Sequence, residues 1–207
     1  MFSPRVIMAV WIILTPLGAH AVEEYTDAEA ALLPNWCEFH RKGSTSDPMV
    51  AAKLAAFKRE GCGGQHHYCW GMATANRVLM PSTLGYPSLD RAKMTWEFEA
   101  AVGDLDYVIK HSKGTCSLIP DIHTKSGEWM TLVGRYDQAE KRFRKAIGVK
   151  NDFAPAYIGL SDLFEIREKP NDALAVLQAG IKANPQSTAL KKKLSRLQQR
   201  IAQQPSP

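Results

Sequence analysis

The sequence predicts an all-α fold, an α-solenoid of about three stacked helix hairpins with an N-terminal helical extension and a C-terminal capping helix. Two observations lead to this prediction. Apolar residues recur at spacings of three and four along most of the chain, which is the period of an amphipathic helix. A small, large, small pattern also returns after 34 residues, a period typical of stacked helix hairpins. Its two copies are Ala139, Phe143 and Ala146, followed by Ala173, Leu177 and Gly180.

The first 21 residues have the features of a secretory signal peptide. Arg5 gives a basic start, residues 6–14 form an uninterrupted apolar run, and Ala19-His20-Ala21 matches the small-x-small cleavage pattern. The apolar run is shorter than the roughly 20 residues that a membrane-spanning helix needs. We therefore expect residues 1–21 to be removed and the mature protein to be secreted, or periplasmic if its source is bacterial.

The rest of the chain has the composition of one folded domain, since the protein is 45% apolar and 23% charged. Residues 22–64 are expected to form the helical extension. Within it, apolar spacing predicts a helix over residues 26–42 that Pro34 bends or delays. Asp47 is a favourable N-cap for a second helix over residues 49–59, because its carboxylate can accept hydrogen bonds from the first free N–H groups.

Three helix hairpins are expected next, over residues 65–115, 116–153 and 154–187. Each has two amphipathic helices joined by a turn that contains Gly, Pro or Asn. The predicted helices are 65–80 and 88–112, 119–134 and 137–149, and 154–168 and 171–183. Residues 188–207 should form a capping helix and tail, whose apolar stripe consists of Leu190, Leu194, Leu197 and Ile201.

The third hairpin carries the positions of a known repeat. They are Tyr157, Leu160, Ser161 and Phe164 in its first helix, and Ala173, Leu177, Gly180 and Pro185 in and after its second. In these residues the chain resembles the tetratricopeptide repeat family. The second hairpin is similar to the family in its turn, Gly134-Arg135-Tyr136, but has Asn151 where proline is usual. The first hairpin looks degenerate.

The resemblance implies a function in binding rather than in catalysis. Repeats of this kind supply a concave surface, so we expect an exported protein-interaction scaffold, or an accessory or assembly subunit, that binds a partner protein or peptide. An envelope complex is one candidate assembly. Segments 33–37 and 66–71 also resemble small exported bacterial proteins of this family, to which no activity is attached.

The family's register implies which side chains line the groove. They are Gln65, Tyr68, Met72, Asn76, Asp121, Thr124, Glu128, Thr131, Ile158, Asp162, Glu165 and Ile166. Carboxylates supply hydrogen-bond acceptors and the Ile and Met side chains supply contact area, so this surface would suit an extended peptide or a helix with basic and apolar side chains. The alternative is that these are solvated helix residues without a partner.

Four cysteines, an even number in a chain expected to be exported, predict two disulfides. The sequence alone allows three connectivities. In an antiparallel hairpin, the start of the first helix and the end of the second lie at the same rim. This arrangement favours a bond between Cys62 and Cys116, which leaves Cys37 to pair with Cys69.

A metal- or thiol-handling role is the main alternative to a scaffold. It would use the thiolates and imidazoles of Cys37, His40, Cys62, His66 and Cys69. That site needs reduced thiols, which exported proteins usually lack. Signatures of hydrolases, zinc proteases and phosphate-binding loops are missing from the sequence. We therefore expect no catalytic residue, no bound metal and no cofactor.

The C-terminal end is basic, with no acidic residue after Asp172. Its basic patch consists of Lys191, Lys192, Lys193, Arg196 and Arg200. Such a helix face attracts anionic partners, so a membrane-surface adaptor is a second alternative, and a solvated face is the simpler one. Nucleic acid and small molecules are not expected as partners, because the four tryptophans between residues 36 and 129 read as core residues rather than a stacking platform.

Overall fold

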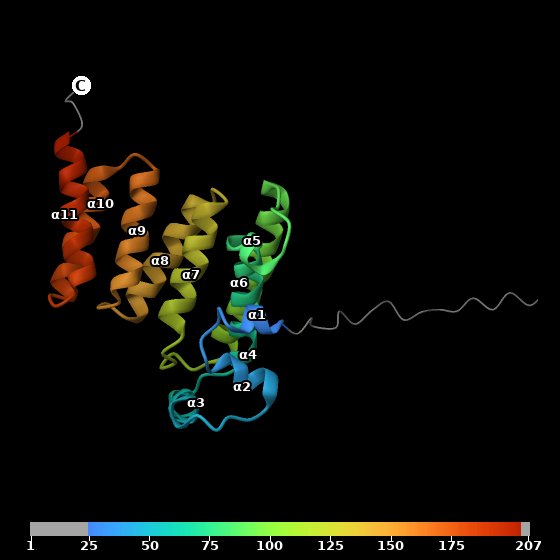
Figure 1. The fold of residues 1–207 in the computed structure, drawn as a ribbon. Helices are drawn as coiled ribbons and strands as arrows, with labels where there is room; N and C mark the ends of the chain where they lie inside the picture. Colours follow the sequence, from blue (N-terminus) through green and yellow to red (C-terminus); the bar gives the residue numbers. More distant parts are fainter. Residues whose placement is uncertain (1–24, 204–207) are drawn as a thin grey trace, which may run out of the picture.

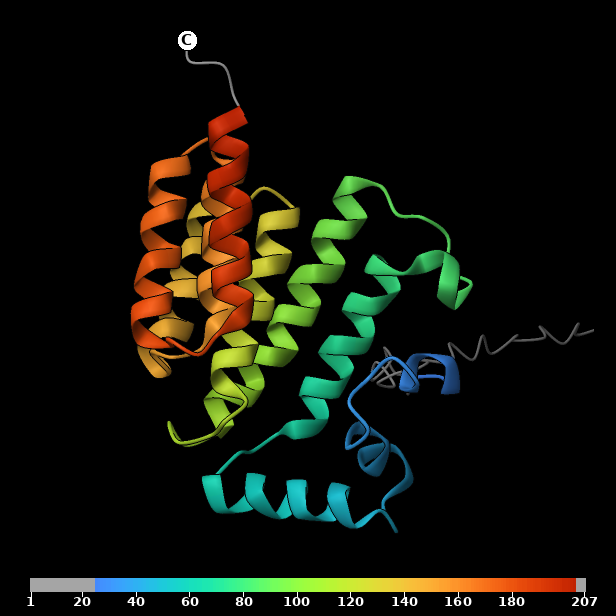
Figure 2. The same cartoon turned by 60° about the vertical axis from the view of Figure 1, so that its left-hand side comes forward.

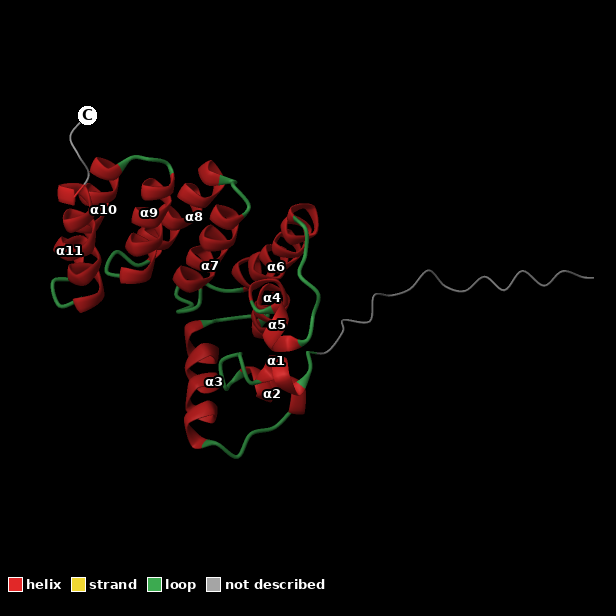
Figure 3. Ribbon diagram, turned by 45° about the horizontal axis from the view of Figure 1, so that its top comes forward, coloured by secondary structure: helices red, strands yellow, loops and turns green. Residues whose placement is uncertain are grey.

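The computed structural model describes residues 25–203, and all of its regular secondary structure in this range is α-helical (Figure 1). The helices are joined by turns and loops, as Figure 3 shows. The expected all-α solenoid is confirmed. Within residues 25–203, none of the helices combines the length and the apolar character that crossing a bilayer requires. The predicted signal peptide, residues 1–21, lies outside the described residues.

The N-terminal extension contains α1 (Asp27–Ala30), α2 (Cys37–Lys42) and α3 (Pro48–Glu60). The single helix expected over residues 26–42 is therefore two short helices, because Pro34 has no N–H to donate and restricts the residue before it. The start of α3 is as expected: Asp47 Oδ1 accepts a hydrogen bond from the backbone N–H of Met49 at 2.8 Å.

The three hairpins follow in the predicted order, and the last helix packs on the third of them. The first hairpin has α4 (Gln65–Leu79) and α6 (Arg91–His111), the second α7 (Ile119–Leu132) and α8 (Tyr136–Val149), the third α9 (Ala154–Ile166) and α10 (Pro170–Ala183), and α11 (Thr188–Gln203) ends the stack. The short α5 (Pro81–Leu84) was not predicted. It begins at the proline that ends α4 and fills the loop of the first hairpin.

The helices α7 to α11 stand side by side in sequence order, while the N-terminal extension lies at one end of the first hairpin (Figures 1 and 2). The buried apolar residues of the described chain form two clusters. One includes Phe57, Phe98 and Trp129 and joins the extension to the first hairpin and α7. The other includes Phe143 and Leu177 and contains residues from each of the helices α8, α9, α10 and α11. The half-buried Met130 packs against both clusters.

The second cluster is centred on the ring of Phe143, which packs between α7 and α9. A Cβ placed on Gly127 would lie 2.9 Å from Phe143 Cε1, and one placed on Gly159 would overlap the same ring. Only glycine lets both backbones come this close. Ala139, Phe143 and Ala146, the first copy of the 34-residue pattern, are all buried and form the seam between neighbouring hairpins.

The turn inside each of the last two hairpins contains a residue with left-handed backbone. Gly134 has a φ of +82°, and Glu168, which stands 34 residues later in the corresponding turn, has a φ of +57°. Glycine accepts this conformation without a steric cost, whereas a residue with a Cβ does not. The repeat geometry therefore imposes a conformation on Glu168 that its side chain disfavours.

Both predicted cysteine pairs are disulfides, Cys37–Cys69 and Cys62–Cys116, and no free cysteine remains in residues 25–203. The first links α2 to α4. The second links the segment before α4 to the segment after α6, where Lys113 N–H also donates a hydrogen bond to the Gly61 carbonyl at 2.8 Å. The bonds close loops of 32 and 54 residues, and each stabilises the fold by about 4 kcal/mol through loss of unfolded-chain entropy.

One correction concerns the tryptophans. Trp36 and Trp129 are buried as expected and Trp70 is half-buried, but Trp96 is 66% exposed. Trp96 lies on α6, a helix that packs mainly against α4 and α7, and most of its side chain faces solvent. Apolar spacing alone cannot identify which apolar residues of a long helix have a partner.

We expect Gly159→Ala to lower the free energy of unfolding by about 1 to 3 kcal/mol, because the added methyl overlaps the Phe143 ring. Urea unfolding of the purified protein measures this. The matched control is Gly103→Ala in α6, where an added Cβ meets no atom within 4 Å. That variant should be neutral or more stable by up to about 1 kcal/mol. Equal loss in both variants would show that the ring contact has no special role.

We also expect Glu168→Gly to raise the free energy of unfolding by about 1 kcal/mol, because it removes the steric cost of the left-handed backbone. Glu168→Ala serves as the control, since alanine loses the carboxylate but keeps the strain. Thermal unfolding followed by circular dichroism distinguishes the two. A gain of similar size in the alanine variant would point to charge rather than backbone conformation.

Candidate functional site

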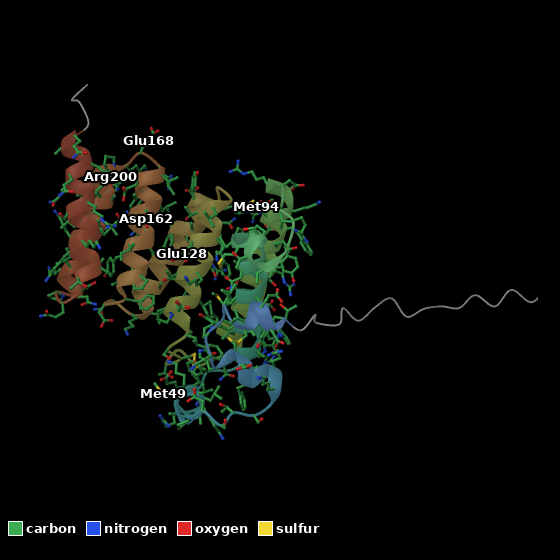
Figure 4. All side chains as sticks on the ribbon, in the orientation of Figure 1. Met49, Met94, Glu128, Asp162, Glu168 and Arg200 are labelled. Atoms are coloured by element: carbon green, nitrogen blue, oxygen red, sulfur yellow. A yellow bond between two sulfur atoms is a disulfide. The ribbon has the colours of Figure 1, made fainter. Side chains whose placement is uncertain are left out.

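The inner helices of the second and third hairpins, α7 and α9, enclose a groove with a volume of about 450 Å³. Its lining residues are Glu128, Thr131, Leu132, Phe143, Pro155, Ile158, Gly159, Asp162 and Ile166. Five of these belong to the set predicted from the repeat register. Figure 4 shows two of them, Glu128 on α7 and Asp162 on the neighbouring α9.

The groove is mainly apolar. The Phe143 ring lies at its floor against Gly159, which has no side chain, and is itself almost fully buried. Its walls include Leu132 and Ile166, which are 52% and 53% exposed. Large aliphatic side chains that gather at a hollow and remain in water are typical of a surface that another molecule covers.

The carboxylates at the groove are already paired within the chain. Glu128 accepts a hydrogen bond from Lys125 Nζ at 3.1 Å. Asp162 pairs with Lys193 of α11. Glu165, also predicted to line the groove, instead lines a separate hollow beside α11, and it pairs with Lys193 at 2.8 Å and also with Arg200.

The groove therefore differs from the expectation of a surface with free acceptors for a basic partner. The remaining predicted carboxylate, Asp121, accepts a hydrogen bond from the Tyr68 hydroxyl at 2.6 Å. That contact and burial raise the pKa of the Tyr68 hydroxyl above its usual range, with burial the larger cause. A basic ligand at Asp162 or Glu165 would have to displace a side chain of α11.

The predicted basic patch contains both residues that pair within the chain and residues that face solvent. Lys193 and Arg200 point to α9 and neutralise its acidic residues. Lys191, Lys192 and Arg196 stay exposed on the outer side of α11. Two of the five predicted residues are therefore paired with carboxylates of α9, and three face solvent.

Three of the lining predictions, on α4 and α7, fall on buried residues. Tyr68 and Asn76 are only 5% and 6% exposed, and Thr124 is 1% exposed. The N-terminal extension covers this part of α4, and the ring of Trp36 lies 5.3 Å from that of Tyr68. The hydroxyl of Thr124 donates a hydrogen bond to the Pro120 carbonyl at 2.9 Å.

The two other predicted lining residues on α4, Gln65 and Met72, make contacts near their own positions in the chain or within the core. Gln65 Nε2 donates a hydrogen bond to the Cys62 carbonyl at 3.0 Å at the helix start, and Met72 is half-buried against the N-terminal cluster. One sequence signal could have shown that α4 is covered. Pairing of Cys37 with Cys69 places α2 directly on α4.

The proposed thiol or metal site has no thiolates to offer, because all four cysteines are in disulfides. Within residues 25–203, no group of three or more Cys, His, Asp or Glu residues is arranged to hold a metal ion. His40 and His66 do lie near each other, with ring centroids 6.2 Å apart. Burial, and then the neighbouring His66, lowers the pKa of His40.

A comparison with protein families agrees with this architecture over part of the chain. The family model described as Tetratricopeptide repeat matches residues 132–197, from the end of α7 into α11. No curated protein matches the sequence.

Several solved structures are similar to parts of the chain. The second tetratricopeptide domain of human RPAP3, in complex with an HSP70 peptide, is 13% identical and aligns over 66% of this chain and 98% of its own, with a TM-score of 0.45. The Arabidopsis OM64 tetratricopeptide domain is 18% identical over 53% of this chain and 87% of its own, with a TM-score of 0.41. A MamA double mutant is 18% identical over 86% of this chain and 88% of its own, with a TM-score of 0.47.

The family match covers the C-terminal part of the stack of helix hairpins. That segment contains the second helix of one hairpin, the whole of the next and most of the capping helix. Residues 132–197 therefore match the tetratricopeptide repeat family, and the helix hairpins of this segment agree with that match.

Proposed function

We propose that the protein is an interaction scaffold that holds a segment of a partner protein in the groove between α7 and α9. The observation that carries this proposal is the apolar groove itself, with the Phe143 ring as its floor and the half-exposed Leu132 and Ile166 as its walls. The hollow of about 450 Å³ is within the usual size of binding pockets, roughly 300 to 1,000 Å³. The repeat family is typically a non-enzymatic interaction scaffold, which supports the same function.

The chemistry of the groove favours an apolar segment over a strongly basic one. Because Glu128 and Asp162 are paired with Lys125 and Lys193, a cation on the partner gains little where a lysine is already present. A Leu, Ile, Met or Phe side chain would instead bury the exposed surfaces of Leu132 and Ile166. Each such side chain contributes about 1.5 to 3 kcal/mol when it is fully covered.

We further propose that the scaffold works outside the cytosol, as an accessory or assembly subunit of an envelope complex. The signal-peptide pattern of residues 1–21 supports export. The two disulfides support it independently, because such bonds persist in oxidising compartments.

Site-specific photo-crosslinking in the native host tests the groove. The crosslinking amino acid p-benzoylphenylalanine replaces Leu132 or Ile166 in the groove, or Val149 on α8 as the control. Val149 is 46% exposed, much like the two groove residues, but lies on α8 and does not line the groove. We expect the same discrete crosslinked partner from both groove positions and none from residue 149.

Leu132→Asp should then abolish that crosslink when the probe is at residue 166, while Val149→Asp should leave it unchanged. Both variants should keep the thermal midpoint of the wild type, because the replaced side chains are about half exposed. Equal crosslinking from all three positions, or a crosslink that survives Leu132→Asp, would contradict binding in the groove.

A further inference from the structure

A second hollow lies on the opposite side of α7 from the groove. Groove residues Glu128, Thr131 and Leu132 are spaced three and four apart and share one face of the helix, whereas Met130 and Val133 lie on the other face. That other face and α6 enclose a cavity of about 180 Å³, called here the socket. The socket is lined by Thr95, Phe98, Glu99, Val102, Met130, Val133 and Arg135.

The socket is an apolar site with a charged rim. Phe98 and Val102 are buried at its base, at 2% and 8% exposure. At the rim, Arg135 forms an ion pair with Glu99 across the gap between the α7–α8 turn and α6. A small, partly enclosed space with aromatic and aliphatic walls fits one bulky apolar side chain, which is how anchor residues bind at protein interfaces.

A basic hollow adjoins the socket and shares Met130 as a wall. This hollow, called here the shelf, has a volume of about 540 Å³, and its lining residues are Met130, Gln138, Lys141, Arg142, Arg144 and Lys145. Four of these residues are spaced three, one and three apart along α8 and therefore form one face of the helix: Gln138, Lys141, Arg142 and Lys145. That face lies opposite to Phe143, which points into the core.

The shelf has an excess of positive charge. Both oxygens of Asp106 accept hydrogen bonds from Arg142, each at 2.6 Å, and Glu140 accepts one from Arg144 at 2.9 Å. Within residues 25–203, Lys141 and Lys145 have no ion pair of this kind, and none of the lining residues is acidic. Two cations therefore face solvent without compensation.

The buried His123 on α7 responds to this positive field. Its pKa is lowered to about 4, mainly by burial and in smaller part by the charges of Arg142 and Lys145, which outweigh the nearby Asp106. Its ring is 7% exposed. The positive charge of the shelf therefore also acts on a buried side chain.

We propose that the face formed by α6, α7 and α8 binds an acidic segment of a partner protein that carries one bulky apolar residue. The apolar side chain enters the socket, and the flanking carboxylates lie over Lys141, Arg142 and Lys145 on the shelf. Charge complementarity selects an acidic partner, and the socket selects a peptide over a lipid surface, because a bilayer offers no single side chain to fill it. This surface is separate from the groove, so the two sites can be occupied together.

Fluorescence anisotropy with a labelled probe peptide tests the proposal. The probe is a run of about twelve glutamates with one central phenylalanine, and its control has alanine at that position. We expect the phenylalanine probe to bind the full mature protein at least about tenfold more tightly than the alanine probe, a difference of about 1.4 kcal/mol.

Two pairs of protein variants assign the contacts. The double variant Lys141→Glu/Lys145→Glu should weaken binding of the phenylalanine probe by at least about tenfold. The matched control, Lys191→Glu/Lys192→Glu on α11, changes the net charge equally and should have a much smaller effect. Thr95→Phe, which fills the socket, should reduce the affinity for the phenylalanine probe to that for the alanine probe, while Leu132→Asp in the groove should not alter it.

Several results would overturn the proposal. They are equal affinity for the two probes, an equal loss in the two double-charge variants, or no binding of the probe to the wild-type protein. Binding of anionic phosphatidylserine vesicles that depends on Lys141 and Lys145, without binding of the peptide, would assign the face to membranes instead. If Thr95→Phe fails to fold, comparison of the two probes still decides whether the socket is used.

Discussion

The packing of the Phe143 ring between two glycines is the contact on which the repeat architecture depends. Gly127 on α7 and Gly159 on α9 each leave room for one side of the ring. The ring thereby sets the separation of the two inner helices and, at the same time, forms the floor of the groove between them. Stability and the candidate binding surface thus rest on one side chain, and a larger residue at either glycine would affect both.

The two ends of the molecule are held together by different means. Two disulfides and a buried ion pair between Glu29 and Arg77 fix the extension on the first hairpin. The C-terminal half, as far as residue 203, has neither, and depends on the apolar cluster around Phe143 and on the charge pairs of α11 with α9. This division explains why the first hairpin can depart from the repeat pattern, since covalent bonds replace part of its packing.

Helix order, hairpin boundaries and the seam could be predicted from the sequence because each has a local signal, such as the 34-residue recurrence or the N-cap Asp47. The state of the candidate site could not, because it depends on contacts between distant residues. From the sequence, Asp162 and Glu165 are expected to be free hydrogen-bond acceptors. In the fold, Lys193 and Arg200 of α11 form ion pairs with them. Tyr68 and Asn76 fit the groove register, but the extension buries them, and no helical period reports that.

Hydrogen–deuterium exchange of the Phe143→Ala variant tests the central role of this ring most directly. If the ring fixes the inner helices, amides of α8, α9 and α10 should exchange faster than in the wild type, while α4 and α6, held by the disulfides, should keep their protection. Unchanged exchange in α9, or an equal rise in all helices including α4 and α6, would contradict the account.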